Sequence, residues 1–187
     1  MFQVFIKFSG VLAIFSAWVL VIYPAIRYGI NTKRETVSLA TLENKKVGKI
    51  VGLGLIVGTF FQIMFLFYLT QKFSLSYLNL GCLLYLSANL ATILVAIFTY
   101  RKYPVIHNFF TKYYFSIMPI SLVLITFPIR NTSANILFIF SLLMFVLYLF
   151  GQIFLFIKHK EGNSLMEAWA FVTLSVWTLV MTFVPGL

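Results

Sequence analysis

The residues of this sequence that could do chemistry are few, and the most regular set lies in one long apolar run. Cys82, Tyr85, Asn89 and Thr92 follow one another at steps of three and four, which puts them on one face of a helix. Asn89 lies near the middle of the run, where an amide surrounded by hydrocarbon is costly and needs a partner. Tyr85, Asn89 and Thr92 are therefore candidate binding residues that line a ligand or lipid cavity. In the alternative, which we favour for Asn89, its amide only holds two helices together through an interhelical hydrogen bond.

A second candidate site is the pair His107 and Asn108, which lies between two apolar runs. A histidine at a membrane boundary could bind a headgroup phosphate or titrate near neutral pH. In the alternative interpretation this pair is an interfacial cap. Asn108 would then start the following helix, and His107 would bond a loop carbonyl.

No pattern in the sequence specifies a reaction. The chain has no Asp and only four Glu, and none of these lies in the middle of an apolar run. Paired carboxylates for acid–base work, zinc-binding motifs and a phosphate-binding loop are all missing from the sequence. Its two histidines are too few for a histidine-rich metal site. We therefore predict a protein that is not an enzyme and that holds no metal or cofactor.

The elements that must position these residues are membrane-spanning helices. Apolar residues make up 61% of the 187 residues and charged residues only 10%, whereas soluble domains carry about 25% charged residues. A run of about 20 apolar residues crosses the hydrocarbon core as a helix. The sequence predicts an all-α, polytopic bundle of six transmembrane helices in a single membrane domain, 1–187. The spans are expected at about 4–23, 50–70, 77–99, 109–129, 134–157 and 168–184.

The charge of +10 is distributed as in a membrane protein, and not as in a nucleic-acid-binding protein. Eleven of the 14 basic residues lie in the loops 25–49, 100–112 and 158–167, and only three lie on the other side. Because basic loops remain in the cytoplasm, we expect these three loops to be cytoplasmic and both termini to be outside. In a prokaryote the membrane would be the cell membrane.

Small residues and prolines predict how the helices pack. Small residues four apart let helix backbones approach closely in lipid. The predicted packing positions are Ser9, Ala13 and Ala17 in the first span, and Gly48, Gly52, Gly54 and Gly58 at the start of the second. The glycines could instead support a homo-oligomer or contact another membrane protein. Pro119 could kink the fourth span, with hydroxyls such as that of Ser116 satisfying the freed carbonyl groups.

Three short segments carry a resemblance to a known group. They are Tyr23-Pro24; Val37-Ser38-Leu39-Ala40 followed by Asn44 and Gly48; and Gly81 to Phe98 followed by Val105-Ile106-His107-Asn108. Across residues 20 to 125 the chain resembles the DRAM/FRAG-related group of six-span membrane proteins, especially its prokaryotic branch of unknown function. The resemblance implies a six-helix bundle, with eukaryotic relatives linked to lipid organisation and lipid-anchor remodelling. In that group the first loop and the His-Asn loop face away from the cytoplasm, whereas the charge count here places both inside.

Three functions remain open from the sequence. The first is a non-enzymatic protein that binds or organises membrane lipids, with anionic headgroups held at the basic loops. The second is a small-molecule transporter or substrate-binding subunit, which needs a cavity near Asn89. The third is an accessory subunit that packs against another membrane protein. The lack of buried charge in the spans disfavours coupled transport, because a proton-driven transporter usually has one. The sequence does not separate the first function from the third, and we expect the first.

Overall fold

The computed structural model describes residues 2–27, 44–159 and 164–185, and all regular structure in these ranges is helical. Six helical stretches in them are long and apolar enough to cross a membrane, so the predicted all-α bundle of six spanning helices is confirmed. The elements are α1 (Phe2–Ser16), the π-helical η1 (Ala17–Ile22), α2 (Tyr23–Arg27), α4 (Lys45–Lys72), α5 (Leu80–Ile97), α6 (Pro104–Thr126), the 3-10 helix η2 (Phe127–Asn131), α7 (Asn135–His159) and α8 (Ser164–Phe183).

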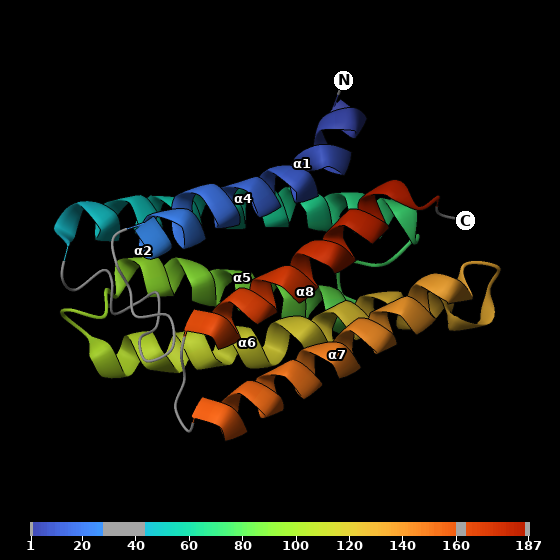
Figure 1. Ribbon diagram of the computed structural model, residues 1–187. Coiled ribbons are helices and arrows are strands. Elements are labelled where there is room, and N and C mark those ends of the chain that lie inside the picture. Colours follow the sequence, from blue (N-terminus) through green and yellow to red (C-terminus); the bar gives the residue numbers. More distant parts are fainter. Residues whose placement is uncertain (1, 28–43, 160–163, 186–187) are drawn as a thin grey trace.

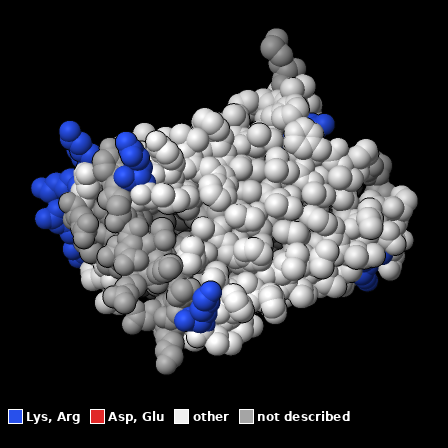
Figure 2. Space-filling model, viewed as in Figure 1, with Lys and Arg blue, Asp and Glu red and all other residues white. Residues whose placement is uncertain are grey.

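The helices lie lengthwise in one bundle, and consecutive spans alternate in direction (Figure 1). Both chain termini lie toward the same end. Basic side chains gather at the opposite end, where α2, α5 and α7 finish and α4, α6 and α8 begin (Figure 2). We call it the basic end, defined by Arg27, Lys45, Lys46, Lys49, Arg101, Lys102 and Lys158. The segments 28–43 and 160–163, which carry the remaining parts of two predicted basic loops and the 37–40 segment of the resemblance, lie outside the described residues.

The bundle is packed tightly in one half and hollow in the other. The main apolar core joins the end of α4, the start of α5, the end of α6, the start of α7 and the end of α8. All of these lie away from the basic end. Phe65, Tyr85, Ile125, Leu137 and Trp177 are among its large members, and each is almost completely buried. The opposite halves of α4, α5, α6 and α8 surround a cavity instead.

The first span does not end at Pro24, as the sequence led us to expect, but continues to Arg27. A proline lacks an amide hydrogen, and its ring crowds the carbonyl group four residues earlier. That carbonyl group belongs to Leu20, in the π-helical segment η1, where the Tyr23 amide donates to the carbonyl oxygen of Trp18. The wider π-turn accommodates the ring, so the helix passes through the proline.

Pro119 lies inside α6, and a neighbouring helix repairs the hydrogen bond that it removes. A proline at 119 cannot donate to the carbonyl oxygen of Phe115. The hydroxyl of Tyr148, on α7, donates to this oxygen at 2.7 Å. As expected, a hydroxyl group bonds the carbonyl group that the proline leaves free. This hydroxyl belongs to Tyr148 and not to Ser116, which is exposed.

Only some of the predicted small residues lie at helix contacts. A Cβ atom added to Gly54 would lie 2.5 Å from the Cβ of Leu20, and one added to Gly58 would lie 3.6 Å from the Cβ of Ser16. These two glycines therefore let the first span approach α4. Ser9 and Ala13 are buried on the first span, and Ala17 is half-buried. Gly52 differs from the prediction, because a Cβ there would meet nothing within 4 Å.

Two of the glycines whose close packing the sequence analysis missed lie at contacts at least as close as that of Gly54. A Cβ added to Gly81 would lie 2.5 Å from the backbone nitrogen of Ile125, so α5 and α6 touch backbone to backbone here. A Cβ added to Gly151 would overlap the indole ring of Trp169, whose Nε1 donates to the carbonyl oxygen of Leu147. Neither glycine belongs to a glycine pair spaced by four, so the spacing rule could not find them.

Candidate functional site: a cavity beneath the basic end

The hollow half of the bundle contains a cavity of about 770 Å³. Ligand pockets typically measure about 300–1,000 Å³. Four basic side chains line it where it reaches the basic end: Lys45 and Lys49 at the start of α4, and Arg101 and Lys102 in the turn between α5 and α6. Glu167, near the start of α8, also lines it. The rim of the cavity therefore carries a net positive charge.

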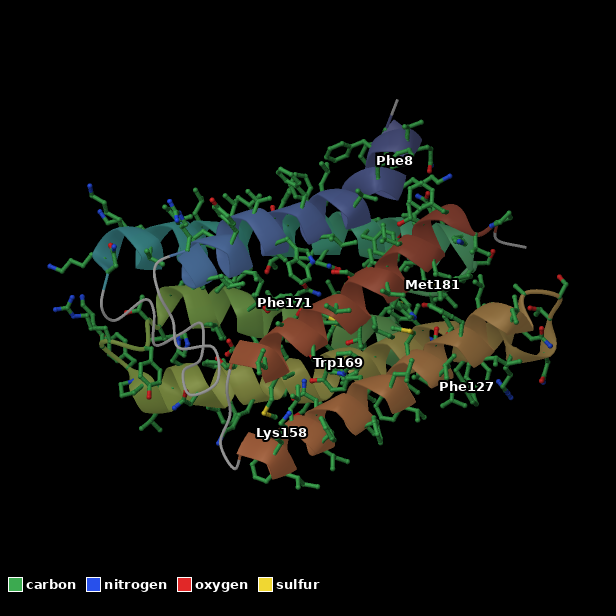
Figure 3. The ribbon with its side chains drawn as sticks, in the orientation of Figure 1. Phe8, Phe127, Lys158, Trp169, Phe171 and Met181 are labelled. Carbon is green, nitrogen blue, oxygen red and sulfur yellow. The ribbon has the colours of Figure 1, made fainter. Side chains whose placement is uncertain are left out.

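The walls below this rim are apolar. Ile56 of α4, Val95 of α5, Phe115 of α6 and Phe171 of α8 all line the cavity, and Phe171 is labelled in Figure 3. Gly52 has open space where a side chain would begin, and it lines this cavity together with Gly48. The two glycine pairs of α4 thus have different roles. Gly54 and Gly58 pack against the first span, whereas Gly48 and Gly52 line the cavity.

His107 lies in the cavity wall, in the first turns of α6, and is only 5% exposed. Its Nδ1 lies 2.9 Å from the carbonyl oxygen of Phe98. Because a carbonyl oxygen can only accept, Nδ1 carries the hydrogen in this bond. The imidazole and the ring of Tyr100 also pack edge to face, at 5.6 Å between centroids. The hydrogen bond from His107 to Phe98 is the one that the interfacial-cap interpretation predicted. It holds the turn that carries Arg101 and Lys102.

Asn108 is not brought together with the other candidates. The helix begins at Pro104, with Tyr103 at its N-cap, so Asn108 does not start it. Its side chain is exposed and does not line the cavity. The physical reason is the helical period, because the residue after a buried histidine points about 100° away from it.

The other candidates, Tyr85, Asn89 and Thr92, lie at or beside a smaller polar pocket deeper in the bundle. This pocket has a volume of about 50 Å³, and Asn89 and Thr92 line it. Asn89 is 1% exposed, and its Nδ2 donates to the carbonyl oxygen of Tyr85 at 2.9 Å. The Tyr85 hydroxyl in turn donates to Oε1 of Gln62 on α4. The hydrogen bond that joins the two helices is therefore made by Tyr85, and Asn89 bonds its own helix.

Gln62 and Thr59 were missed by the sequence analysis, although both also line the polar pocket. The signal was present in the sequence, since Gln62 is an amide inside the apolar run 50–70. An amide there needs a partner for the same reason as Asn89. Ser175 of α8 lines the pocket from another side and accepts a hydrogen bond from Nε1 of Trp18 at 3.1 Å.

The two cavities offer a ligand different kinds of side chain. Within residues 2–27, 44–159 and 164–185, no three His, Cys, Asp or Glu side chains cluster closely enough to hold a metal ion. The larger cavity offers cations and apolar walls, and the smaller offers neutral hydroxyl and amide groups. Together they suit a molecule with an anionic group and an apolar body.

Comparison with known proteins identifies a family but no activity. Neither a search of curated proteins nor a search of solved structures gives a match. The family model described as "Protein of unknown function (DUF998)" matches residues 10–184, which covers five of the spans and most of the first. That description makes no reference to the DRAM/FRAG-related group. Since the match extends over nearly the whole chain, this protein with six membrane-type helices belongs to the DUF998 family.

Proposed function

We propose that this protein binds an anionic membrane lipid in the cavity beneath the basic end, and that it does so without catalysing a reaction. The observation that carries the proposal is the combination of a cationic rim and apolar walls in one cavity. A lipid has the same division between a charged headgroup and an acyl chain.

The volume of the cavity favours a lipid with a single acyl chain, and the charges at its rim favour an anionic headgroup. If each non-hydrogen atom takes about the 30 Å³ of a liquid water molecule, the 770 Å³ cavity holds about 25 such atoms. That is enough for one chain and a small headgroup. Lys45, Lys49, Arg101 and Lys102 would each contribute about 1 kcal/mol to the attraction of an anionic headgroup near the surface.

We also propose that the basic end lies in the cytoplasm. The three loops of this side contain eleven basic residues, against three on the other side, and basic loops remain in the cytoplasm. The cytoplasmic leaflet is also where anionic lipids give the membrane its negative surface potential. The cavity would then draw its ligand from the leaflet that contains it.

Native mass spectrometry of the gently purified protein tests this proposal, with lipid analysis of whatever remains bound. Gly52→Leu should lower the retained anionic lipid severalfold, because the added side chain enters a cavity where a Cβ meets nothing. Ser116→Leu is the matched control, since it adds similar bulk at an exposed position outside the cavity. Equal retention in the wild type and both variants would refute lipid binding in this cavity.

A second candidate function is small-molecule transport or substrate capture. The polar pocket beside Asn89 favours it, since a transporter needs a site near the middle of the membrane. The same mass spectrometry separates the two functions. A non-lipid metabolite that is retained by the wild type and lost in Asn89→Ala would favour transport.

A further inference from the structure

The small polar pocket directly adjoins the large cavity. Both are lined by Val21, Leu55, Thr92, Tyr114 and Phe171. Among the described residues, no charged side chain lines the polar pocket, whereas its lining includes hydroxyl groups from four helices and two amide side chains. A molecule lying in the large cavity with its charged group at the basic end would therefore direct its opposite end toward neutral hydrogen-bonding groups.

The hydroxyl of Thr59 is a buried polar group at this pocket that lacks a partner among the described residues. Thr59 lines the pocket and is only 3% exposed, yet its Oγ1 is buried without a hydrogen-bond partner in the part of the chain that the structure describes. A threonine inside a helix commonly bonds a carbonyl group of the preceding turn, as Thr182 does here at 2.8 Å. Leaving a buried hydroxyl unpaired is costly, so a hydrogen-bonding group in the pocket would remove that cost.

The register of α4 gives the distance between the two kinds of site. Lys49 lines the large cavity near its rim, and Thr59 lies ten residues further along the same helix. With a rise of about 1.5 Å per residue, the two positions lie about 15 Å apart along the axis. The pocket volume of about 50 Å³ admits a group of one or two non-hydrogen atoms, at about 30 Å³ for each.

We infer that the polar pocket is a subsite for a neutral hydrogen-bonding group, such as a hydroxyl, carried by the same anionic amphiphile about 15 Å from its charged group. This inference rests on the proposed function and narrows it to single-chain amphiphiles with polar groups at both ends. Thr59 supplies the unpaired hydroxyl, and the amides of Gln62 and Asn89 border the same space. A water molecule is the other source of the same chemistry.

A comparison of laurate with ω-hydroxylaurate tests the inference. The two probes share a carboxylate and a chain length, and they differ only in the terminal hydroxyl. Binding is measured to the full-length protein in nanodiscs of a zwitterionic phospholipid, with empty nanodiscs as background. The wild type should bind ω-hydroxylaurate about three- to tenfold more tightly than laurate, the value of one neutral hydrogen bond. Thr59→Val should abolish this preference and leave laurate binding unchanged.

Thr182→Val is the matched control, because Thr182 is also buried but lines neither cavity. It should keep the preference for the hydroxylated probe. If both probes bind the wild type equally, the subsite inference fails while lipid binding stands. A preference for ω-hydroxylaurate that survives Thr59→Val also overturns the subsite inference. The terminal hydroxyl of the probe would then not bond to Thr59, and water would be the occupant of the pocket. If neither probe binds above the background, the proposed function fails as well.

Discussion

Removing two charges from the rim of the cavity should weaken the binding of anionic lipid about thirtyfold. The perturbation is the double variant Lys49→Gln and Arg101→Gln, whose two positions line the cavity from α4 and from the α5–α6 turn. Each basic residue near the surface contributes about 1 kcal/mol to the attraction of an anionic lipid, so the pair contributes about 2 kcal/mol. Since about 1.4 kcal/mol corresponds to a tenfold change in Kd, the expected loss is about thirtyfold.

The assay is a titration of the protein with an anionic and a zwitterionic lipid of the same chains, followed by native mass spectrometry. Only the anionic lipid should lose affinity, and the difference should shrink at high salt, where exposed charges are screened. The control is Lys46→Gln with Lys158→Gln, which removes the same charge from the basic end without changing the lining of the cavity. An equal loss in the control, or no loss in the rim variant, would refute the rim as the headgroup site.

Four further substitutions concern the bundle that holds the cavity, and the effect of each is measured as a change in the free energy of unfolding in mixed micelles. Gly81→Ala should destabilise the protein by about 1–3 kcal/mol, because its Cβ would collide with the backbone of α6. Gly52→Ala should be neutral or stabilising by up to about 1 kcal/mol, because alanine is the better helix former and nothing lies within 4 Å; equal effects at the two glycines would contradict this account. Tyr148→Phe should cost about 1–2 kcal/mol, because the carbonyl group of Phe115 loses the hydroxyl that substitutes for the amide that Pro119 lacks; no loss would show that this hydrogen bond does not stabilise the helix. Lys72→Met should cost about 2 kcal/mol, because the lysine Nζ donates to two carbonyl groups at the end of α8, at 2.5 and 2.6 Å; an unchanged stability would contradict this capping role.

The sequence predicted the bundle well because composition and run length decide it. A run of about 20 apolar residues has few stable structures in lipid other than a helix, so six runs predict six spans. Helix ends were harder to predict. Pro24 looked like a terminus, but a π-helical segment before it lets the helix continue. That outcome depends on local backbone geometry, which residue type alone does not specify.

The candidate site was only partly predictable. His107 and Thr92 do line the large cavity, and Asn89 lines the polar pocket, but Asn108 lies outside both. A cavity depends on which helix faces meet, and a single sequence does not give the pairing of its helices. Gly52 illustrates the limit, since the spacing that predicted close packing also suits an open cavity wall.

Photo-crosslinking tests the central claim, lipid binding in the hollow half of the bundle, most directly. The probe is an anionic lipid with a diazirine in its acyl chain, and the labelled peptides are mapped by mass spectrometry. This account predicts labelling of the cavity walls, at Ile56, Val95 and Phe115, and its suppression by excess unlabelled anionic lipid. Labelling confined to exposed positions such as Phe150 and Phe154 on α7, without competition, would contradict it.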